Sequence, residues 1–191
     1  SEVIKIANCS GFYGDNLSIA KKMVEGGPID VLTGDYLAEL TMTILYNQKM
    51  KRGENLGYVG TFLKQFRDVA KLCNDQKIKI VSNAGGLNPA SMAAEVENII
   101  KELNLDLKVA YIDGDDLMPR LDELSSSGEM LKNIDKNNGL FSYEKKPLTA
   151  NAYLGAWGIK EALDNGADVV ICPRVTDAAV VIGPAAWKFN W

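Results

Sequence analysis

The sequence predicts an α/β fold with a mostly parallel sheet and helices on both faces, a Rossmann-like or flavodoxin-like three-layer sandwich. Short β-branched runs alternate five times with segments of helical periodicity. Most of these runs end in a turn rich in glycine or small polar residues, and a helix start follows. Parallel strands joined through helices need right-handed crossovers, which bring their carboxyl ends to one edge of the sheet. We therefore expect that edge to carry the function.

Five short apolar runs are the predicted strands, at residues 3–7, 29–32, 77–81, 107–112 and 168–172. Between them, apolar residues recur at helical spacing, which predicts helices with one buried face. The marker positions are Leu17, Ala20, Val24; Leu37, Leu40, Ile44; Phe62, Phe66, Val69, Cys73; Met92, Val96, Ile99, Leu103; and Ala152, Ile159, Leu163. A last helix after Thr176 or Asp177 is apolar on nearly every side, so we expect it to be buried.

Polar residues at the strand exits are predicted to cap the helices that follow. Asn88 precedes Pro89, a standard N-cap and first-turn pair. Asp15, Asp35, Asp116 and Asp177 occupy similar positions, and each cap would stabilise its helix by about 1 kcal/mol.

The chain is expected to form a single α/β domain over residues 1–191, the amino-terminal part of a longer family domain. Residues 125–148 interrupt the pattern with a polar, turn-rich excursion that is too long for an ordinary connection. We expect a surface flap or hairpin that covers the mouth of the sheet. Trp187, Phe189 and Trp191 crowd the last five residues, which suggests packing against this domain or a further segment.

Composition excludes several classes of protein. The 191 residues are 47% hydrophobic and 24% charged, with a net charge of −4 and no basic block, which disfavours nucleic-acid and membrane-surface binding. No apolar run is long enough for a membrane span and the first residues do not resemble a signal peptide, so we expect a cytoplasmic protein. Three cysteines without a CxxC favour reduced thiols, and the absence of histidine excludes a Ser-His or Cys-His dyad within this chain.

Carboxylates and one arginine are the candidate catalytic groups. Asp35, Asp113 and Asp115 follow predicted strands, and Arg174 follows the last one. Such a cluster can keep a carboxyl group protonated for acid-base work or bind a substrate carboxylate. Alternatively, Asp35 is a helix cap and Arg174 forms an internal salt bridge with one of the aspartates.

A divalent cation is a second hypothesis for the same edge. Asp15, Asp113 and Asp177 would supply the oxygen ligands that Mg²⁺ or Ca²⁺ prefers. The alternative is again that Asp15 and Asp177 only cap helices.

Two glycine turns are candidate cofactor sites because free backbone N–H groups can bind phosphate. The residues concerned are Ser10, Gly11, Gly14, Asn83, Gly85 and Gly86. They would hold the phosphates of CoA or a nucleotide. Neither turn is a GxGxxG or GxxxxGK[ST] motif, so the sequence carries no dinucleotide or NTP fingerprint.

Several motifs together resemble the amino-terminal domain of the AtuA family of acyclic terpene utilisation proteins. The motifs are CSGFYGD (9–15), TGDYLAELTM (33–42), NAGGLNP (83–89), GDDL (114–117) with LDEL (121–124), NAYLGA (151–156) and RVTDA (174–178). The resemblance covers nearly the whole chain. It implies a role in the breakdown of citronellol- and geraniol-type acids as CoA thioesters, and members that continue into a further segment, second domain or partner subunit.

The first hypothesis for function is therefore an enzyme domain that binds a small polar or CoA-linked carboxylic acid at the carboxyl edge of the sheet. The alternative is a non-catalytic assembly module that docks a second AtuA-like domain or subunit. We also expect a homo-oligomer.

Overall fold

In a computed structural model, which describes residues 2–191, five parallel strands form one sheet in the order β1-β2-β3-β5-β4. The strands are short and close to the predicted positions: β1 Ile6–Asn8, β2 Val31–Gly34, β3 Lys79–Ser82, β4 Val109–Tyr111 and β5 Val169–Ile171. In the register, Val81 lies between Thr33 and Val170. The α/β class and the parallel sheet are confirmed.

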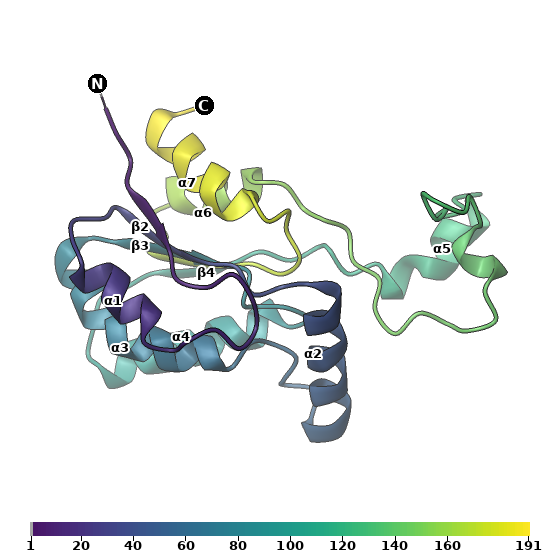
Figure 1. Cartoon of the computed structure of the whole chain (residues 1–191), viewed down its shortest axis with the longest axis horizontal. Coiled ribbons are helices and arrows are strands. Elements are labelled where there is room, and N and C mark those ends of the chain that lie inside the picture. The colour runs from purple at the N-terminus through teal and green to yellow at the C-terminus, as the bar shows by residue number, and fades with distance from the viewer. Residues whose placement is uncertain (1) are drawn as a thin grey trace.

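Helices cover both faces of the sheet, as Figure 1 shows. The helices are α1 Ile19–Glu25, α2 Glu39–Arg52, α3 Thr61–Gln76, α4 Pro89–Glu102, α5 Leu121–Ser126, α6 Trp157–Asp164 and α7 Ala179–Phe189, with 3₁₀ turns η1 Met118–Arg120 and η2 Leu140–Ser142. The helices α1, α3 and α4 lie on one face, and α6 and α7 lie on the other.

Strand order explains this division. From β1 to β4 the chain moves across the sheet in one direction, so right-handed crossovers place α1, α3 and α4 on the same face. The chain then returns from β4 to β5. Helix α6, which precedes β5, and helix α7, which follows it, lie on the opposite face. The reversal falls between the neighbouring strands β3 and β5, whose exits lead to opposite faces.

The sheet separates two apolar cores. Leu32, Ile80 and Ile171 pack with Phe62 and Phe66 on the α1/α3/α4 face, where most of the core lies. Residues adjacent to them along the strands, Val31, Val81 and Val170, point to the α6/α7 face. Burial on both faces explains why the strands are continuously apolar rather than alternating.

Most of the predicted aspartate caps are wrong. The N-cap residues of α1, α2 and α7 are Ser18, Ala38 and Ala178, and none makes a capping side-chain hydrogen bond. Asp15, Asp35 and Asp177 therefore lie in the loops before these helices, as does Thr176. By contrast, Asn88 caps α4 and accepts a hydrogen bond from Ser91 N at 3.3 Å. Asp116 Oδ1 accepts one from Met118 N at 2.9 Å, although the N-cap of η1 is Leu117.

The polar excursion is longer than predicted, and it does not cover the mouth of the sheet. It forms an arm over residues 117–150, closed at its base by an antiparallel bridge between Asp116 and Asn151. Figure 1 shows that the arm, which carries α5, extends away from the three layers, so it does not cover the edge of the sheet. In the part of the arm that the structure describes, Leu121 and Gly139 alone are buried.

The last helix is less buried than predicted. Val181 and Ile182 are 42% and 46% exposed, although Ala179, Val180 and Ala186 are buried. The terminal aromatic residues Phe189 and Trp191 stack on each other with ring centroids 5.8 Å apart. No helix within residues 2–191 combines the length and apolarity that a membrane crossing requires.

Gly85 fixes how closely the exits of β3 and β5 approach. A Cβ atom at this position would lie 2.6 Å from the carbonyl oxygen of Cys172 and 2.8 Å from Pro89 Cβ. We predict that Gly85→Ala lowers the free energy of unfolding by about 1–3 kcal/mol, because backbone rather than a flexible side chain must move. Chemical denaturation measures this loss.

Gly155→Ala is the matched control, since no atom lies within 4 Å of the added Cβ there. Equal stability of the two variants would contradict close packing at Gly85.

Candidate functional site

The exits of β3 and β5 each hold a buried polar residue with a long or amide side chain at the carboxyl edge of the sheet. Asn83 follows β3 and is fully buried, and Arg174 follows β5 and is 5% exposed. Since the helices after these strands leave to opposite faces, this is the point where open α/β sheets bind their ligands. Asp35 follows the next strand in the sheet, β2, so three neighbouring exits meet here.

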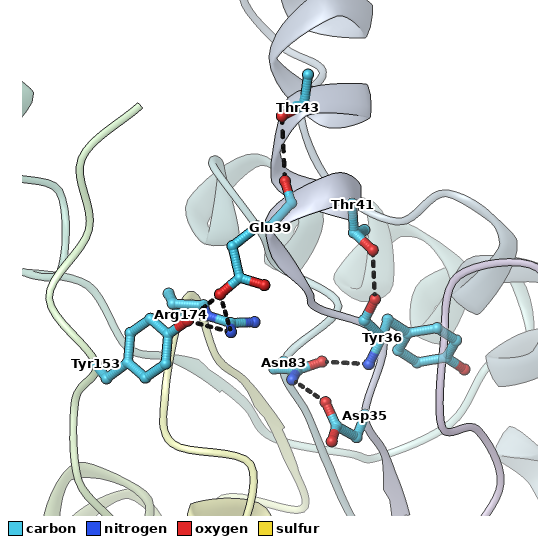
Figure 2. A network of polar contacts seen from close by, with 8 residues as sticks. All are labelled: Asp35, Tyr36, Glu39, Thr41, Thr43, Asn83, Tyr153 and Arg174. Atoms are coloured by element: carbon cyan, nitrogen blue, oxygen red, sulfur yellow. Dashed lines mark hydrogen bonds and ion pairs between the residues drawn. The ribbon is translucent and has the colours of Figure 1, made fainter. Parts of the chain in front are cut away.

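Asn83 links the exits of β2 and β3. Its Oδ1 accepts a hydrogen bond from Tyr36 N at 2.8 Å, and its Nδ2 donates to Asp35 Oδ1 at 2.6 Å (Figure 2). These two contacts define the orientation of the amide. They hold the half-buried Asp35 carboxylate at the mouth of the exits.

Asp35 is the carboxyl group whose environment best suits acid-base work. Burial raises its pKa above the ordinary value of 3.8, the hydrogen bond from Asn83 opposes the rise, and the Asp177 carboxylate adds to it. The Arg174 guanidinium has a weaker, lowering effect on the same pKa. Asp35, Asp177 and Arg174 therefore lie close enough to interact electrostatically.

Arg174 makes few contacts for a buried guanidinium. Nη2 donates to Tyr153 Oη at 2.6 Å and lies 3.8 Å from Glu39 Oε1, and the guanidinium carbon is 4.2 Å from the centroid of the Tyr153 ring. Nη1 is buried and has no hydrogen-bond partner within residues 2–191. In Figure 2 the guanidinium lies between Tyr153 and the Asn83–Asp35 pair. A buried donor without a partner is costly, so Nη1 is the one buried polar side-chain atom of this cluster whose hydrogen-bonding capacity is unused within residues 2–191.

Glu39 and Tyr153 complete the cluster from opposite sides. Thr41 Oγ1 donates to Tyr36 O at 3.0 Å, which fixes the first turn of α2 and places Glu39 beside Arg174. Tyr153 Oη donates to Glu39 Oε1 at 2.8 Å, and this hydrogen bond lowers the pKa of Glu39. The sequence analysis did not single out either residue, although both lie in its family motifs, TGDYLAELTM and NAYLGA.

Asp115 positions the backbone of Arg174 rather than its side chain. Its Oδ2 accepts hydrogen bonds from Arg174 N at 3.1 Å and from Asn151 Nδ2 at 2.9 Å. Burial raises the pKa of Asp115, and these hydrogen bonds oppose the rise. The predicted salt bridge between Arg174 and an aspartate is therefore replaced by an ion pair with Glu39.

Asp15 and Asp113 lie at opposite ends of the carboxyl edge of the sheet. They follow the two edge strands, β1 and β4, which are separated by four strand spacings, or roughly 19 Å. No three acidic or cysteine side chains within residues 2–191 lie close enough together to hold a metal ion. The structure thus does not gather Asp15, Asp113 and Asp177 into one metal site, and it is Asp115, rather than Asp113, that forms a hydrogen bond with Arg174.

Each of the two glycine turns uses some of its N–H groups for internal hydrogen bonds. The Asp15 carboxylate accepts from Gly11 N at 2.8 Å and from Ser10 Oγ at 3.4 Å, so a carboxylate already occupies the place of an anion. Gly14 lies in the same loop with a positive φ.

In the second turn, Ala84 N donates to Ser82 Oγ and Gly86 N to Asn83 O. Gly85 and Gly86 are buried, and an added Cβ at Gly86 would meet Leu45. Close packing explains these two glycines better than phosphate binding does.

The cysteines behave as core residues. Cys9, Cys73 and Cys172 are free and buried. Burial raises the pKa of all three thiols, that of Cys73 to about 12. None is suited to act as a thiolate nucleophile near neutral pH.

The fold and the cluster define a doubly wound α/β protein whose polar residues gather where its strand order reverses. The chain belongs to the AtuA family: the model of the family described as "Acyclic terpene utilisation family protein AtuA" matches residues 4–191. This membership associates the chain with acyclic terpene utilisation. No curated protein and no solved structure matches it.

We predict that Asp35→Asn makes the protein more stable than the wild type at neutral pH. The raised pKa means that the folded state binds a proton more tightly than the unfolded state, so stability is greatest below about pH 4 and falls as pH rises through the pKa of the folded state. Asparagine keeps an oxygen for Asn83 without the charge. Thermal unfolding between about pH 4 and pH 8 measures the effect.

We expect a rise of a few degrees at most, because Asp35 is only half-buried. The control is Asp106→Asn, which removes an exposed carboxylate. A stability difference between Asp35→Asn and wild type that does not shrink towards acid pH would contradict the raised pKa.

Proposed function

We propose that the protein binds the carboxyl end of a small branched-chain acid, free or as its CoA thioester, at the Arg174 cluster. The observation that carries this proposal is the unpartnered Nη1 of a guanidinium that is otherwise buried at the switch point of the sheet. A carboxylate or thioester carbonyl oxygen is the acceptor that such a donor requires. Membership in an acyclic terpene utilisation family supports a branched-chain acid as the ligand class.

Asp35 is the proposed acid-base group of this site. Its raised pKa keeps the proton-bound form accessible, and it lies beside the guanidinium that would orient the ligand. A carboxyl group in that position can exchange a proton with the carbon or oxygen next to the bound carboxyl group. This makes an enzyme that activates the acyl group the favoured role.

Arg174→Gln should weaken the binding of 3-methylbutanoate at least tenfold, because a charge-assisted hydrogen bond contributes about 1.5–3 kcal/mol. Isothermal titration calorimetry with 3-methylbutanoate and its CoA thioester measures the loss and shows which form binds. Arg174→Lys keeps the charge without the planar fork, so we expect it to bind more weakly than the wild type.

Arg120→Gln is the control, because it removes an exposed guanidinium that pairs with Glu123 on the arm. Unchanged affinity in a folded Arg174→Gln variant would overturn the proposal. Melting temperatures of all variants separate loss of binding from loss of folding.

An assembly module is the second candidate, and the arm is the observation that favours it. Met130, Ile134 and Phe141 are 53%, 99% and 47% exposed on a segment with almost no core of its own. A docking role predicts that stability and size depend on protein concentration. Light scattering and thermal unfolding over a wide dilution series should show association that Ile134→Lys removes; a concentration-independent monomer would contradict this role.

A further inference from the structure

A cavity of about 240 Å³ lies between α2, the turn after β3 and the base of the arm. Its apolar wall consists of Tyr46 and Met50 from α2, Leu87 from the turn, and Met118 and Leu148 from the two ends of the arm. The polar network of Figure 2 does not include these residues. The interactions of the Arg174 cluster therefore do not account for this cavity.

The chemistry of the wall suits a flexible hydrocarbon chain. Met50 and Leu148 are 62% and 53% exposed although they line a cavity, so an apolar occupant would remove their surfaces from water. Methionine side chains adapt to irregular shapes such as methyl branches. The polar part of the lining consists of Lys49, Glu54, Asp116 and Thr149. Lys49 lies 3.6 Å from Glu54, which partly compensates its charge.

The cavity and the Arg174 cluster are bordered by the same two elements. Helix α2 begins at Glu39, beside Arg174, and reaches Tyr46 after seven residues, or roughly 10 Å along its axis. On the arm side, Asp115 binds Arg174 N and the next residue, Asp116, lines the cavity. This separation along α2 suits an extended chain held by its carboxyl end at Arg174, and it exceeds the length of a short acid.

We propose that this cavity is the subsite for the branched hydrocarbon chain of an acyclic terpenoid acid. The placement of the chain rests on the proposed function, in which the carboxyl end lies at Arg174. The volume is below the about 300–1,000 Å³ of pockets that enclose a whole drug-sized ligand, so the cavity takes the chain alone. The family description, acyclic terpene utilisation, supports a branched rather than a linear chain.

The test compares two double variants by calorimetry. Met50→Gln with Leu148→Gln makes the cavity wall polar at two exposed positions, and Val3→Gln with Met23→Gln makes the same kind of change at two exposed positions outside the cavity and the arm. The probes are citronellic acid, citronellol, 3-methylbutanoate and linear decanoate. Together these probes separate the contributions that the carboxyl group, the chain length and the methyl branches make to binding.

We expect the wild type to bind citronellic acid more tightly than 3-methylbutanoate. In the cavity variant, the ratio of the two affinities should fall at least tenfold. The variant should also weaken the binding of citronellol, which has the chain but no carboxylate. The control variant should resemble the wild type. A cavity variant that keeps the full preference overturns the subsite, and decanoate binding as tightly as citronellic acid overturns the terpenoid assignment.

The outcomes also separate this subsite from the proposed function. If both acids bind through Arg174 but the cavity variant has no effect, the proposed function stands and the subsite fails. If citronellol binds and is weakened by the cavity variant while neither acid binds, the subsite stands and the carboxylate role of Arg174 fails.

Discussion

The reversal of strand order between β3 and β5 is the constraint on which the rest of the structure depends. It sends α4 to one face of the sheet and α7 to the other, so the two exits separate and leave polar backbone and side chains between them. Gly85 allows the exits to pack at the level of Cys172 before they part. Asn83 and Arg174 then follow at the point where the exits diverge, which explains why a glycine turn and a buried arginine occur together.

Burial of Arg174 is the main energetic cost at this edge. A guanidinium removed from water needs partners for its N–H groups, and here Tyr153 supplies a ring face and a hydroxyl while Glu39 supplies partial charge neutralisation. Nη1 remains without a partner. Meanwhile burial raises the pKa of Asp35, and the Asp177 carboxylate adds to this rise. A ligand oxygen at Nη1 would satisfy the unpaired donor of Arg174. A proton on Asp35 would remove the half-buried negative charge beside Asp177.

Sequence patterns predicted the strands and the Asn88 cap, which depend on neighbouring residues. They did not predict features that are set by contacts between distant parts of the chain. The strands and the Asn88 cap follow from local spacing, and they agree with the structure. Asp35 looks locally like a cap, but its partner is Asn83, 48 residues away, so the helix begins later. Asp113 and Asp115 look alike in sequence; only Asp115 turns towards Arg174, because the base of the arm brings Asn151 against it. Glu39 and Tyr153 meet across 114 residues, a pairing that no local pattern encodes.

The arm is coupled to the Arg174 cluster through its base. Asp115, just before the arm, accepts hydrogen bonds from Asn151, just after it, and from the backbone of Arg174. The Asp116–Asn151 bridge closes the two ends, so an insertion of this length leaves the sheet undisturbed. Tyr153 follows two residues later and stacks on the guanidinium. Because the same short segment closes the arm and presents Tyr153, a displacement of the arm base would reach Arg174 directly.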